Sequence, residues 1–470
     1  MRVLLIQPSV GDVYKGTKLE RCIEREAPLN LAALAACLLE RRHSVRILDL
    51  GVESNECSSV EAAVRSFDPD LCGITFRTPL YPAAVEIAQW LKQLRPEMPL
   101  IAGGAHATFY AQEVIQETPF DLAAIGEADR TIVELADRIP WEEIGDIVYR
   151  QGNEVRVQRI PKVEGKRAQG FLEDLDGLPF PAYHLYDLSR YRNVSSFMYR
   201  RQPVGWMETS RGCLAACVFC TKGVFGRTFR AKSPKRVVDE MAHLLECGFK
   251  EIAIADDSFT TEVDRAIAVC DEIIARRMKF PWNCANGLRV SNVTEEFFKK
   301  AAQAGCHLVA FGFETGSRSV LSKIKKGATL EKAALAARWA KQCGITTTGF
   351  FMLGLPGETE RTMQETIDFA CRLDLDYAKF NITIPLPGTE LYHAWKDRMK
   401  IDNWLAYNFH LPARELYTHP ELEWDTIERF ERAAWRRFYF RPGYILRHLR
   451  RAFSEGNLSA SIRIAAAVPW

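Results

Sequence analysis

Short, continuous apolar runs alternate with longer segments of helical periodicity over the first 140 residues. The apolar runs predict strands at residues 3–7, 44–50, 71–76, 99–103 and 122–125. The periodic segments predict helices at residues 28–42, 59–67, 82–94 and 108–116. Strands separated by helices at this spacing form parallel sheets with right-handed crossovers. We therefore expect a doubly wound parallel sheet, a Rossmann-like α/β domain, over residues 1–140.

The same alternation returns between residues 204 and 390. Strands are predicted at residues 204–207, 251–255, 282–286, 308–313, 346–353 and 377–384. Helices are predicted at residues 234–247, 262–277, 295–304, 330–343 and 360–373. Because six strands are fewer than a closed barrel of eight requires, we expect an open, partial (β/α)6 barrel with its chemistry at the carboxyl ends of the strands.

The remaining segments connect and follow these two domains. Residues 141–203 predict a hairpin, with strands at 146–150 and 154–158 around Gly152-Asn153, and then a linker at 175–181 that is rich in Pro and Gly. Residues 391–470 predict a helical C-terminal region. Its stretch at 427–453 is rich in Arg and aromatic residues, and a structural cap on the barrel is favoured over peripheral contact with an anionic membrane.

Composition narrows the classes of partner. Lys and Arg number 62 against 60 Asp and Glu, a formal net charge of +2, so we expect no nucleic-acid partner. Thirteen Cys, an odd number spread over 470 residues, disfavour a disulfide framework and favour a reducing, cytoplasmic compartment. The first apolar run is too short for a signal peptide, and no apolar stretch is long enough to predict a transmembrane helix.

Three closely spaced Cys follow the strand at 204–207 on one loop: Cys213, Cys217 and Cys220. Thiolates are soft ligands that suit zinc or an iron-sulfur cluster, and closed sites of both kinds use four ligands. No other Cys or His lies between Lys222 and Met241, so a closed zinc site would need a ligand from farther away, such as His243 or Cys247. A cluster held by three thiolates instead leaves one iron open to a ligand.

Candidate ligand-binding residues follow the strands of both predicted sheets. In the first domain they are Pro8, Thr75, Arg77, Gly103, Gly104, His106, Gly126 and Glu127. In the barrel they are Asp256, Asp257, Arg289, Glu314 and Gly354. Ligands of open α/β sheets bind beyond the carboxyl ends of the strands, although each position alone also suits an ordinary turn or helix cap. A GxGxxG motif is absent after the first strand, which disfavours a dinucleotide site.

The CxxxCxxC spacing resembles that of the radical S-adenosylmethionine (SAM) enzymes. The resemblance implies that Cys213, Cys217 and Cys220 hold three irons of a 4Fe-4S cluster and that SAM chelates the fourth. It also implies that Asp256 and Asp257 border the ribose and amino group of SAM. Arg289 and Glu314 are then candidates for further SAM contacts, and Gly354 for the edge near adenine.

The first domain, with its motifs at residues 27–31, 103–106 and 125–127, resembles the cobalamin-binding class of that family. The resemblance implies cobalamin contacts at the candidate residues of the first domain. The Asp-x-His-x-x-Gly motif that supplies an axial His in other cobalamin proteins is absent, and neither His43 nor His106 fits it. We therefore expect base-off cobalamin with its nucleotide tail along the sheet, and His106 as a wall residue or a satisfied loop histidine.

Together these resemblances imply a C-methyltransferase that acts on an unactivated carbon through a 5′-deoxyadenosyl radical and methylcobalamin. The alternative is an oxidative cyclase or rearrangement enzyme of the anaerobic magnesium-protoporphyrin monomethyl ester cyclase type. A methylthiotransferase would need a second Cys set, and a zinc or scaffold module is the non-enzymatic alternative. Expected partners are a small-molecule substrate (a lipid, tetrapyrrole or natural-product intermediate) and an electron donor such as flavodoxin or ferredoxin. No catalytic residue is assigned.

Overall fold

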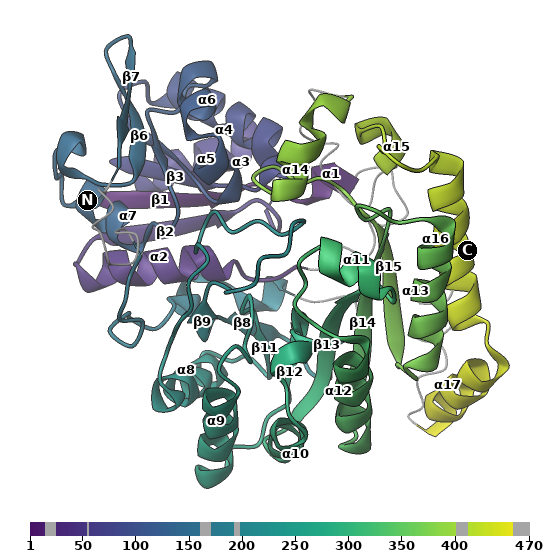
Figure 1. The fold of residues 1–470 in the computed structure, drawn as a ribbon. Helices are drawn as coiled ribbons and strands as arrows, with labels where there is room; N and C mark the ends of the chain where they lie inside the picture. The colour runs from purple at the N-terminus through teal and green to yellow at the C-terminus, as the bar shows by residue number, and fades with distance from the viewer. Residues whose placement is uncertain (15–24, 54–55, 160–170, 192–197, 401–411, 455–470) are drawn as a thin grey trace.

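The computed structural model describes residues 1–14, 25–53, 56–159, 171–191, 198–400 and 412–454. Over these residues the chain forms a seven-stranded sheet, a six-stranded sheet and a two-stranded ribbon. Figure 1 shows the first sheet with its helices on one side of the molecule, the second sheet with its helices on the other, and the last helices along the far edge of the second.

The first sheet has the strand order β2-β1-β3-β4-β5-β6-β7. Its parallel strands are β1 (Arg2–Gln7), β2 (Ser44–Asp49), β3 (Leu71–Thr75), β4 (Leu100–Gly103) and β5 (Leu122–Ala124). Because β1 lies between β2 and β3, the crossovers on its two sides run in opposite directions, which creates the switch point where such sheets bind ligands. Alternate residues of β1 enter separate cores, Leu4 and Ile6 on one face and Val3 and Leu5 on the other. Burial of both faces explains the continuous apolar run.

Helices cover both faces of the first sheet. They are α1 (Gly11–Tyr14), α2 (Leu29–Glu40), α3 (Cys57–Phe67), α4 (Tyr81–Leu94), α5 (Ala105–Phe109), α6 (Ala111–Glu117) and α7 (Asp129–Ala136). The single helix predicted at 108–116 is wrong, because Tyr110 leaves the helical conformation (φ −122°, ψ 35°) and separates α5 from α6. Helix α7 was not predicted. It packs with α2 on the face opposite α3 and α4.

The predicted hairpin is confirmed as β6 (Ile147–Gln151) and β7 (Glu154–Gln158). It pairs antiparallel with β5 and so extends the first sheet, which is parallel only in its first five strands. The hairpin therefore belongs structurally to the first domain. The division of the chain at residues 140, 203 and 390 stays a prediction.

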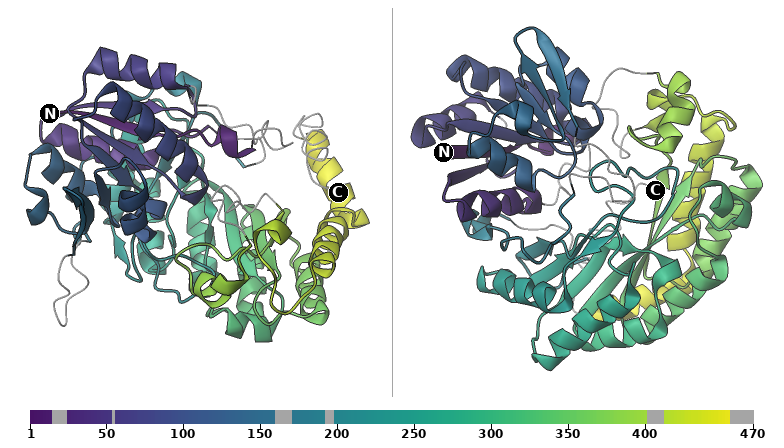
Figure 2. Two further views of the ribbon diagram at one scale, coloured as in Figure 1. Left: turned by 90° about the horizontal axis from the view of Figure 1, so that it is seen from above. Right: turned by 60° about the vertical axis from the view of Figure 1, so that its left-hand side comes forward.

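The second sheet is parallel, with the order β15-β14-β13-β12-β11-β8. Its strands are β8 (Val204–Met207), β11 (Glu251–Ile254), β12 (Trp282–Leu288), β13 (Cys306–Glu314), β14 (Thr346–Leu353) and β15 (Tyr377–Ile382). The helices are α8 (Pro234–Glu246), α9 (Val263–Ala275), α10 (Glu295–Gln303), α11 (Arg318–Lys323), α12 (Leu330–Gln342) and α13 (Glu360–Arg372). In Figure 2 the long helices cover the outer side of this curved sheet, and the main core lies between them and the strands. The six-unit open barrel is therefore confirmed, with α11 as an addition.

The segment between the two sheets contacts both domains. The backbone N–H of Ala182 donates to Ala32 O in α2 at 2.9 Å, and the Tyr183 hydroxyl donates to Trp206 O in β8 at 2.5 Å. Tyr183 is fully buried. The residues that directly follow the predicted linker thus fix α2 of the first domain against the barrel.

The C-terminal region contains α14 (Glu390–Trp395), α15 (Ala413–Leu416), α16 (Trp424–Tyr439) and α17 (Pro442–Ser454). Helix α16 buries Ala434 and Phe438 in the barrel core. Its Arg429 and Arg437 pair with Glu360 and Asp368 of α13 at 2.9 and 2.8 Å. These contacts support the predicted cap. Membrane contact by this region stays a prediction, and within the described residues no helix has the length and apolarity needed to span a bilayer.

Candidate active site

The three motif cysteines lie on residues 212–229, between strands β9 (Ser210–Arg211) and β10 (Arg230–Ala231). Cys213 and Cys217 are buried, whereas Cys220 is exposed. The Lys222 ammonium donates to Cys220 Sγ at 3.1 Å. Burial lowers the pKa of Lys222, but the charges of Cys220, Cys213 and Cys217 outweigh burial and raise it. All three sulfurs therefore lie close enough to one ammonium group to affect its protonation.

This donor set fits a cluster with one open iron. Within the described residues, no three His, Cys, Asp or Glu side chains converge on a position for a single metal ion. Cysteines that hold a 4Fe-4S cluster each bind a different iron, so they need not converge on one point. His243 and Cys247, the two candidates for a fourth zinc ligand, lie beside each other at the C-terminal end of the outer helix α8 (Sγ to Nε2, 3.6 Å).

Asp256 and Asp257, the predicted SAM contacts after β11, have different surroundings. The Asp256 carboxylate is buried and accepts hydrogen bonds from Thr209 N, Thr209 Oγ1 and Ser210 Oγ at 2.5–2.6 Å. It therefore holds the turn that leads into the cysteine loop. Asp257 is exposed at the same strand end. Of the two carboxylates, Asp257 is the one accessible to a ligand.

Arg289 and Glu314 lie beside the cysteine loop and are joined by Lys326. Arg289 Nη1 is 3.9 Å from Cys217 Sγ, and its Nη2 donates to Lys326 O at 2.9 Å. The buried Lys326 ammonium donates to Glu314 Oε1 at 2.6 Å. Sequence reasoning missed Lys326 because it follows α11, a helix of six residues that is too short to produce a clear periodicity. The structure thus brings two of the predicted SAM contacts together and adds a cation.

Gly354 begins a loop that the C-terminal region supports. It has φ +75°, a conformation that favours glycine, and its carbonyl accepts a hydrogen bond from His419 Nε2 at 3.1 Å. His419 Nδ1 accepts from the N–H groups of Glu421 and Leu422, which fixes Nε2 as the protonated nitrogen. At the end of the loop, burial raises the pKa of Glu358 to about 8. Neither His419 nor Glu358 was predicted.

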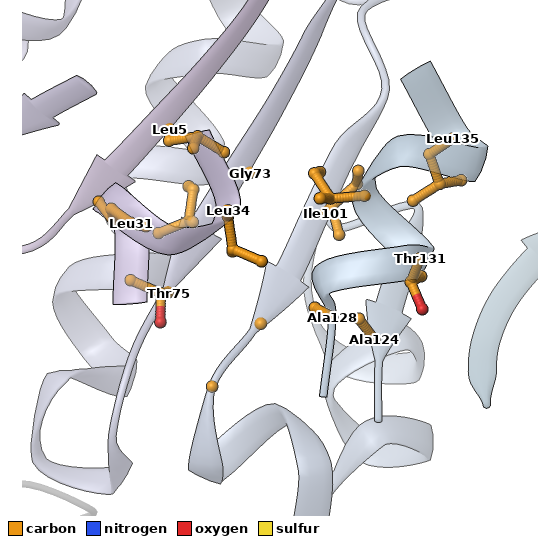
Figure 3. A pocket seen from close by; sticks show the side chains of 14 residues that line it. Leu5, Leu31, Leu34, Gly73, Thr75, Ile101, Ala124, Ala128, Thr131 and Leu135 are labelled. Atoms are coloured by element: carbon orange, nitrogen blue, oxygen red, sulfur yellow. The ribbon is translucent and has the colours of Figure 1, made fainter. Parts of the chain in front are cut away.

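An apolar groove, partly open to solvent, lies over the first sheet. Figure 3 shows Leu31 and Leu34 on one side of it, Thr131 and Leu135 on the other, and Ile101 between them. These side chains come from α2, α7 and β4, and the predicted residues Thr75, Gly103 and Gly104 also line the groove. The groove therefore begins at the carboxyl ends of β3 and β4, at the predicted ligand-binding edge.

The two adjacent glycines of the groove have separate physical roles. A Cβ on Gly103 would meet only Ile74 O, at 3.8 Å, so its absence leaves open space. Gly104 has φ +92°, and a Cβ there would lie 2.7 Å from Phe76 O. Gly104 is thus required by the fold of the turn, whereas Gly103 keeps the groove clear.

His106 does not line the groove. It is 1 % exposed, and its ring lies 4.4 Å from that of Tyr81 and 5.0 Å from that of Tyr110. Its Nδ1 is 3.1 Å from Thr78 Oγ1, and burial lowers its pKa to about 4, so the imidazole is neutral at pH 7. This placement is that of a satisfied histidine in an aromatic core.

The other predicted residues of the first domain lie at the same edge. Thr75 Oγ1 accepts a hydrogen bond from Asn30 Nδ2 at 3.1 Å, Arg77 is exposed, and Pro8 is buried. Gly126 has φ +77°, and a Cβ there would lie 3.3 Å from Val224 O of the cysteine loop. The buried Glu127 carboxylate forms ion pairs with Arg211 and Arg230, so it is directed at the cysteine loop.

Two family models match the chain in separate segments. Residues 24–136 match the B12 binding domain, and residues 207–370 match the Radical SAM superfamily. The chain is 31% identical to an uncharacterized methyltransferase of Pyrococcus horikoshii, over 96% of this chain and 95% of the relative. It is 27% identical to an anaerobic magnesium-protoporphyrin IX monomethyl ester cyclase of Rubrivivax gelatinosus, over 88% of this chain and 73% of the relative.

A solved structure has the same fold. The radical SAM methyltransferase TsrM from Kitasatospora setae, with cobalamin and a 4Fe-4S cluster bound, superposes with a TM-score of 0.68. The match has 22% identity and covers 83% of this chain and 73% of that one. The B12-binding domain, the cysteine loop on the partial barrel and the full-length relative together show that this chain belongs to the B12-binding radical SAM enzymes, whose cofactors are a 4Fe-4S cluster, SAM and cobalamin.

Proposed function

We propose that this radical SAM enzyme is a C-methyltransferase that places a methyl group on an unactivated carbon of a small molecule. The observation that carries the proposal is the direct contact between two sites. The loop that holds Cys213, Cys217 and Cys220 touches the first domain at Gly126 and Glu127, where the predicted cobalamin edge ends. A substrate between the two sites would be within reach of both.

The cysteine loop supplies three thiolates, and cationic side chains lie close to them. Lys222 contacts Cys220 and Arg289 lies near Cys217, so positive groups lie beside the ligands on two sides. Asp257, Arg289, Glu314 and the loop at Gly354 would bind SAM, with the carboxylates accepting hydrogen bonds and the Arg pairing with a carboxylate. Asp256 keeps the loop in place through Thr209 and Ser210.

The groove over the first sheet would hold the nucleotide tail of cobalamin. Its walls are apolar, and Gly103 leaves the entrance clear, so a flat aromatic group can lie along the strands. The neutral, buried His106 contacts Thr78, Tyr81 and Tyr110, which supports cobalamin binding without His106 as an axial ligand. When bound, the cluster with SAM supplies one-electron chemistry and cobalamin supplies methyl transfer.

The residues around both sites position the reactants and keep water away from them. The proposed substrate class comprises lipids, tetrapyrroles and natural-product intermediates, and the proposed electron donor is a flavodoxin or ferredoxin. An oxidative cyclase is the second candidate, because a relative named as an anaerobic magnesium-protoporphyrin IX monomethyl ester cyclase is similar over 88% of this chain and 73% of its own length.

The experiment feeds methyl-labelled methionine to cells that make the protein and to cells that make Cys213→Ala, and compares extracts by mass spectrometry. A labelled metabolite that depends on intact Cys213 is the expected result, and it names the substrate. A dependent metabolite that gains no label but loses hydrogen would favour the cyclase and contradict methyl transfer. Cys57→Ala, at an exposed position outside the cluster loop, is the matched control.

A further inference from the structure

Two arginines lie opposite each other at the neck of the cysteine loop. Strands β9 and β10 form an antiparallel ribbon in which Arg211 pairs with Arg230. Both side chains are buried, at 6% and 2% exposed. Like charges directly opposite on neighbouring strands repel each other, and burial increases that repulsion. The closed neck therefore requires carboxylates from elsewhere.

The first domain supplies most of that negative charge. Arg211 binds Asp129 through two bonds, Nη1 to Oδ2 at 2.8 Å and Nη2 to Oδ1 at 3.1 Å, and Nη1 also donates to Glu127 Oε2 at 2.8 Å. Arg230 binds both oxygens of Glu127, with Nη1 to Oε2 at 3.0 Å. Glu208, from the barrel, accepts from Arg211 Nε at 2.6 Å. Two acids of one domain thus bridge two arginines of the other.

The same short segment forms a wall of the groove. Glu127 and Asp129 flank Ala128, and Ala128 lines the groove together with Thr131 and Ile132 of α7. Ala128, Thr131 and Ile132 therefore face the groove. Glu127 and Asp129, from the same segment, face the cysteine loop. A displacement of this segment would change the position of one site relative to the other.

Steric contacts leave the cysteine loop little freedom of its own. Gly212 has φ +84°, and a Cβ there would lie 2.3 Å from Thr228 O. The two ends of the loop therefore approach each other closely at the neck. Phe109 of the first domain lies against Gly223 and Gly388, where an added Cβ would come within 2.1 and 2.4 Å of its ring. The loop is thus held both by the ion pairs at its neck and by an aromatic contact at its side.

We propose that Glu127 and Asp129 are positioning residues that set the distance and orientation of the cysteine loop relative to the groove. This inference rests on the proposed binding of the cluster and cobalamin at these two sites, but not on methyl transfer. In this proposal Glu127 acts through Arg211 and Arg230, and its contact with a cofactor stays a prediction.

The test uses the reconstituted holoenzyme with reduced cluster and cob(II)alamin, whose magnetic interaction in electron paramagnetic resonance reports the separation of the two centres. The variants are Glu127→Gln, Asp129→Asn and the double variant, which keep shape and remove charge. Glu251→Gln is the control, because Glu251 is a fully buried acid that pairs with His307 at 2.6 Å and lies at the start of β11, the end of the strand away from the cysteine loop. A variant that changes only stability should resemble this control.

The expected result is a broadened distribution of separations in the double variant and an unchanged one in Glu251→Gln, with both cofactors still bound. In the apo protein, amide hydrogens of residues 212–229 should exchange about tenfold faster in the double variant, since a buried charge that loses its partner destabilises the closed state. Glu127→Asp, which keeps the charge, provides a milder variant for both measurements if the neutral variants fail to fold.

An unchanged magnetic interaction together with unchanged exchange of residues 212–229 would overturn the proposal. Equal changes in Glu251→Gln would also overturn it, because the effect would then reflect general stability. A holoenzyme that forms both centres and shows the expected broadening, yet transfers no methyl group, would support the positioning role while contradicting the proposed methyltransferase.

Discussion

The Lys222 ammonium lies 3.1 Å from Sγ of Cys220, the residue two positions before it in the chain. The charges of Cys213 and Cys217 also act on it. A cation at this position stabilises negative charge on the sulfurs, and a reduced iron-sulfur cluster is more negative than an oxidised one. Lys222 is therefore placed to make the cluster easier to reduce.

Lys222→Met should leave the cluster assembled and lower its midpoint potential by roughly 50 mV or more, because a unit charge near the sulfurs is lost. A redox titration followed by electron paramagnetic resonance measures this change. Lys235→Met, on the exposed face of α8, is the control and should leave the potential as it is. Identical potentials for wild type and Lys222→Met would contradict the proposed electrostatic role.

Gly103→Val should weaken cobalamin binding by about ten- to hundredfold, because the added side chain enters the groove while the backbone there tolerates it. An absorbance titration with hydroxocobalamin measures the affinity. Gly443→Val is a suitable control, since a Cβ at that position meets no described atom within 4 Å. If Gly103→Val binds cobalamin as tightly as wild type, the groove does not hold the nucleotide tail.

His106→Phe should cost about 1 kcal/mol of stability through loss of its bond to Thr78, and should leave the spectrum of bound cobalamin unchanged. The reason is that His106 is buried among Tyr81 and Tyr110 and stays neutral, with a pKa of about 4. The electron paramagnetic resonance spectrum of bound cob(II)alamin is the measurement. Nitrogen splitting that disappears in His106→Phe would mean that this imidazole coordinates cobalt.

Glu358 predicts a pH dependence of stability. Burial raises its pKa from 4.5 to about 8 in the folded chain, so between these values the folded state holds a proton that the unfolded state has lost. Stability therefore falls as pH rises from 4.5 to 8 and is level above that. Among the described residues, Glu358 Oε1 has no hydrogen-bond partner, while Oε2 accepts from Leu355 N at 3.0 Å.

Glu358→Gln mimics the protonated acid and should remove this contribution, so that its stability relative to wild type increases between pH 5 and pH 9. Denaturant unfolding at several pH values measures the difference. The conservative exchange Glu360→Gln, at an exposed site on α13, is the control. Parallel stability curves for wild type and Glu358→Gln would show that the carboxyl group is already ionised in the folded protein.

The sequence predicted the strands well because their burial is uniform. Strands β8 and β14 have the predicted bounds, and their residues are almost all buried or half-buried, which produces an unbroken apolar signal. Helices α7 and α11 were missed because each is short, and α7 begins with the charged pair Asp129-Arg130. Its first residue, Asp129, binds Arg211. A local sequence pattern carries no signal for such a tertiary interaction.

The residues of the candidate active site could also be predicted only in part. The spacing of Cys213, Cys217 and Cys220 predicted their shared loop, since all three ligands come from one short segment. Glu127 pairs with an arginine 84 positions away, and Glu314 pairs with Lys326 beyond an unpredicted helix. Contacts between distant segments depend on the packing of the two sheets, so a strand-end position alone could not assign these carboxylates to a partner.

The three cysteines of the loop are expected to hold an iron-sulfur cluster with one iron open to SAM. The most direct measurement is electron paramagnetic resonance of the reduced, anaerobically purified protein before and after SAM is added, together with iron and sulfide analysis. We expect about four irons per chain and a spectrum that shifts on addition of SAM. Both should be lost in Cys213→Ala, Cys217→Ala and Cys220→Ala. A chain that binds zinc in place of iron, or a cluster whose spectrum does not change when SAM is added, would contradict this assignment of the cluster.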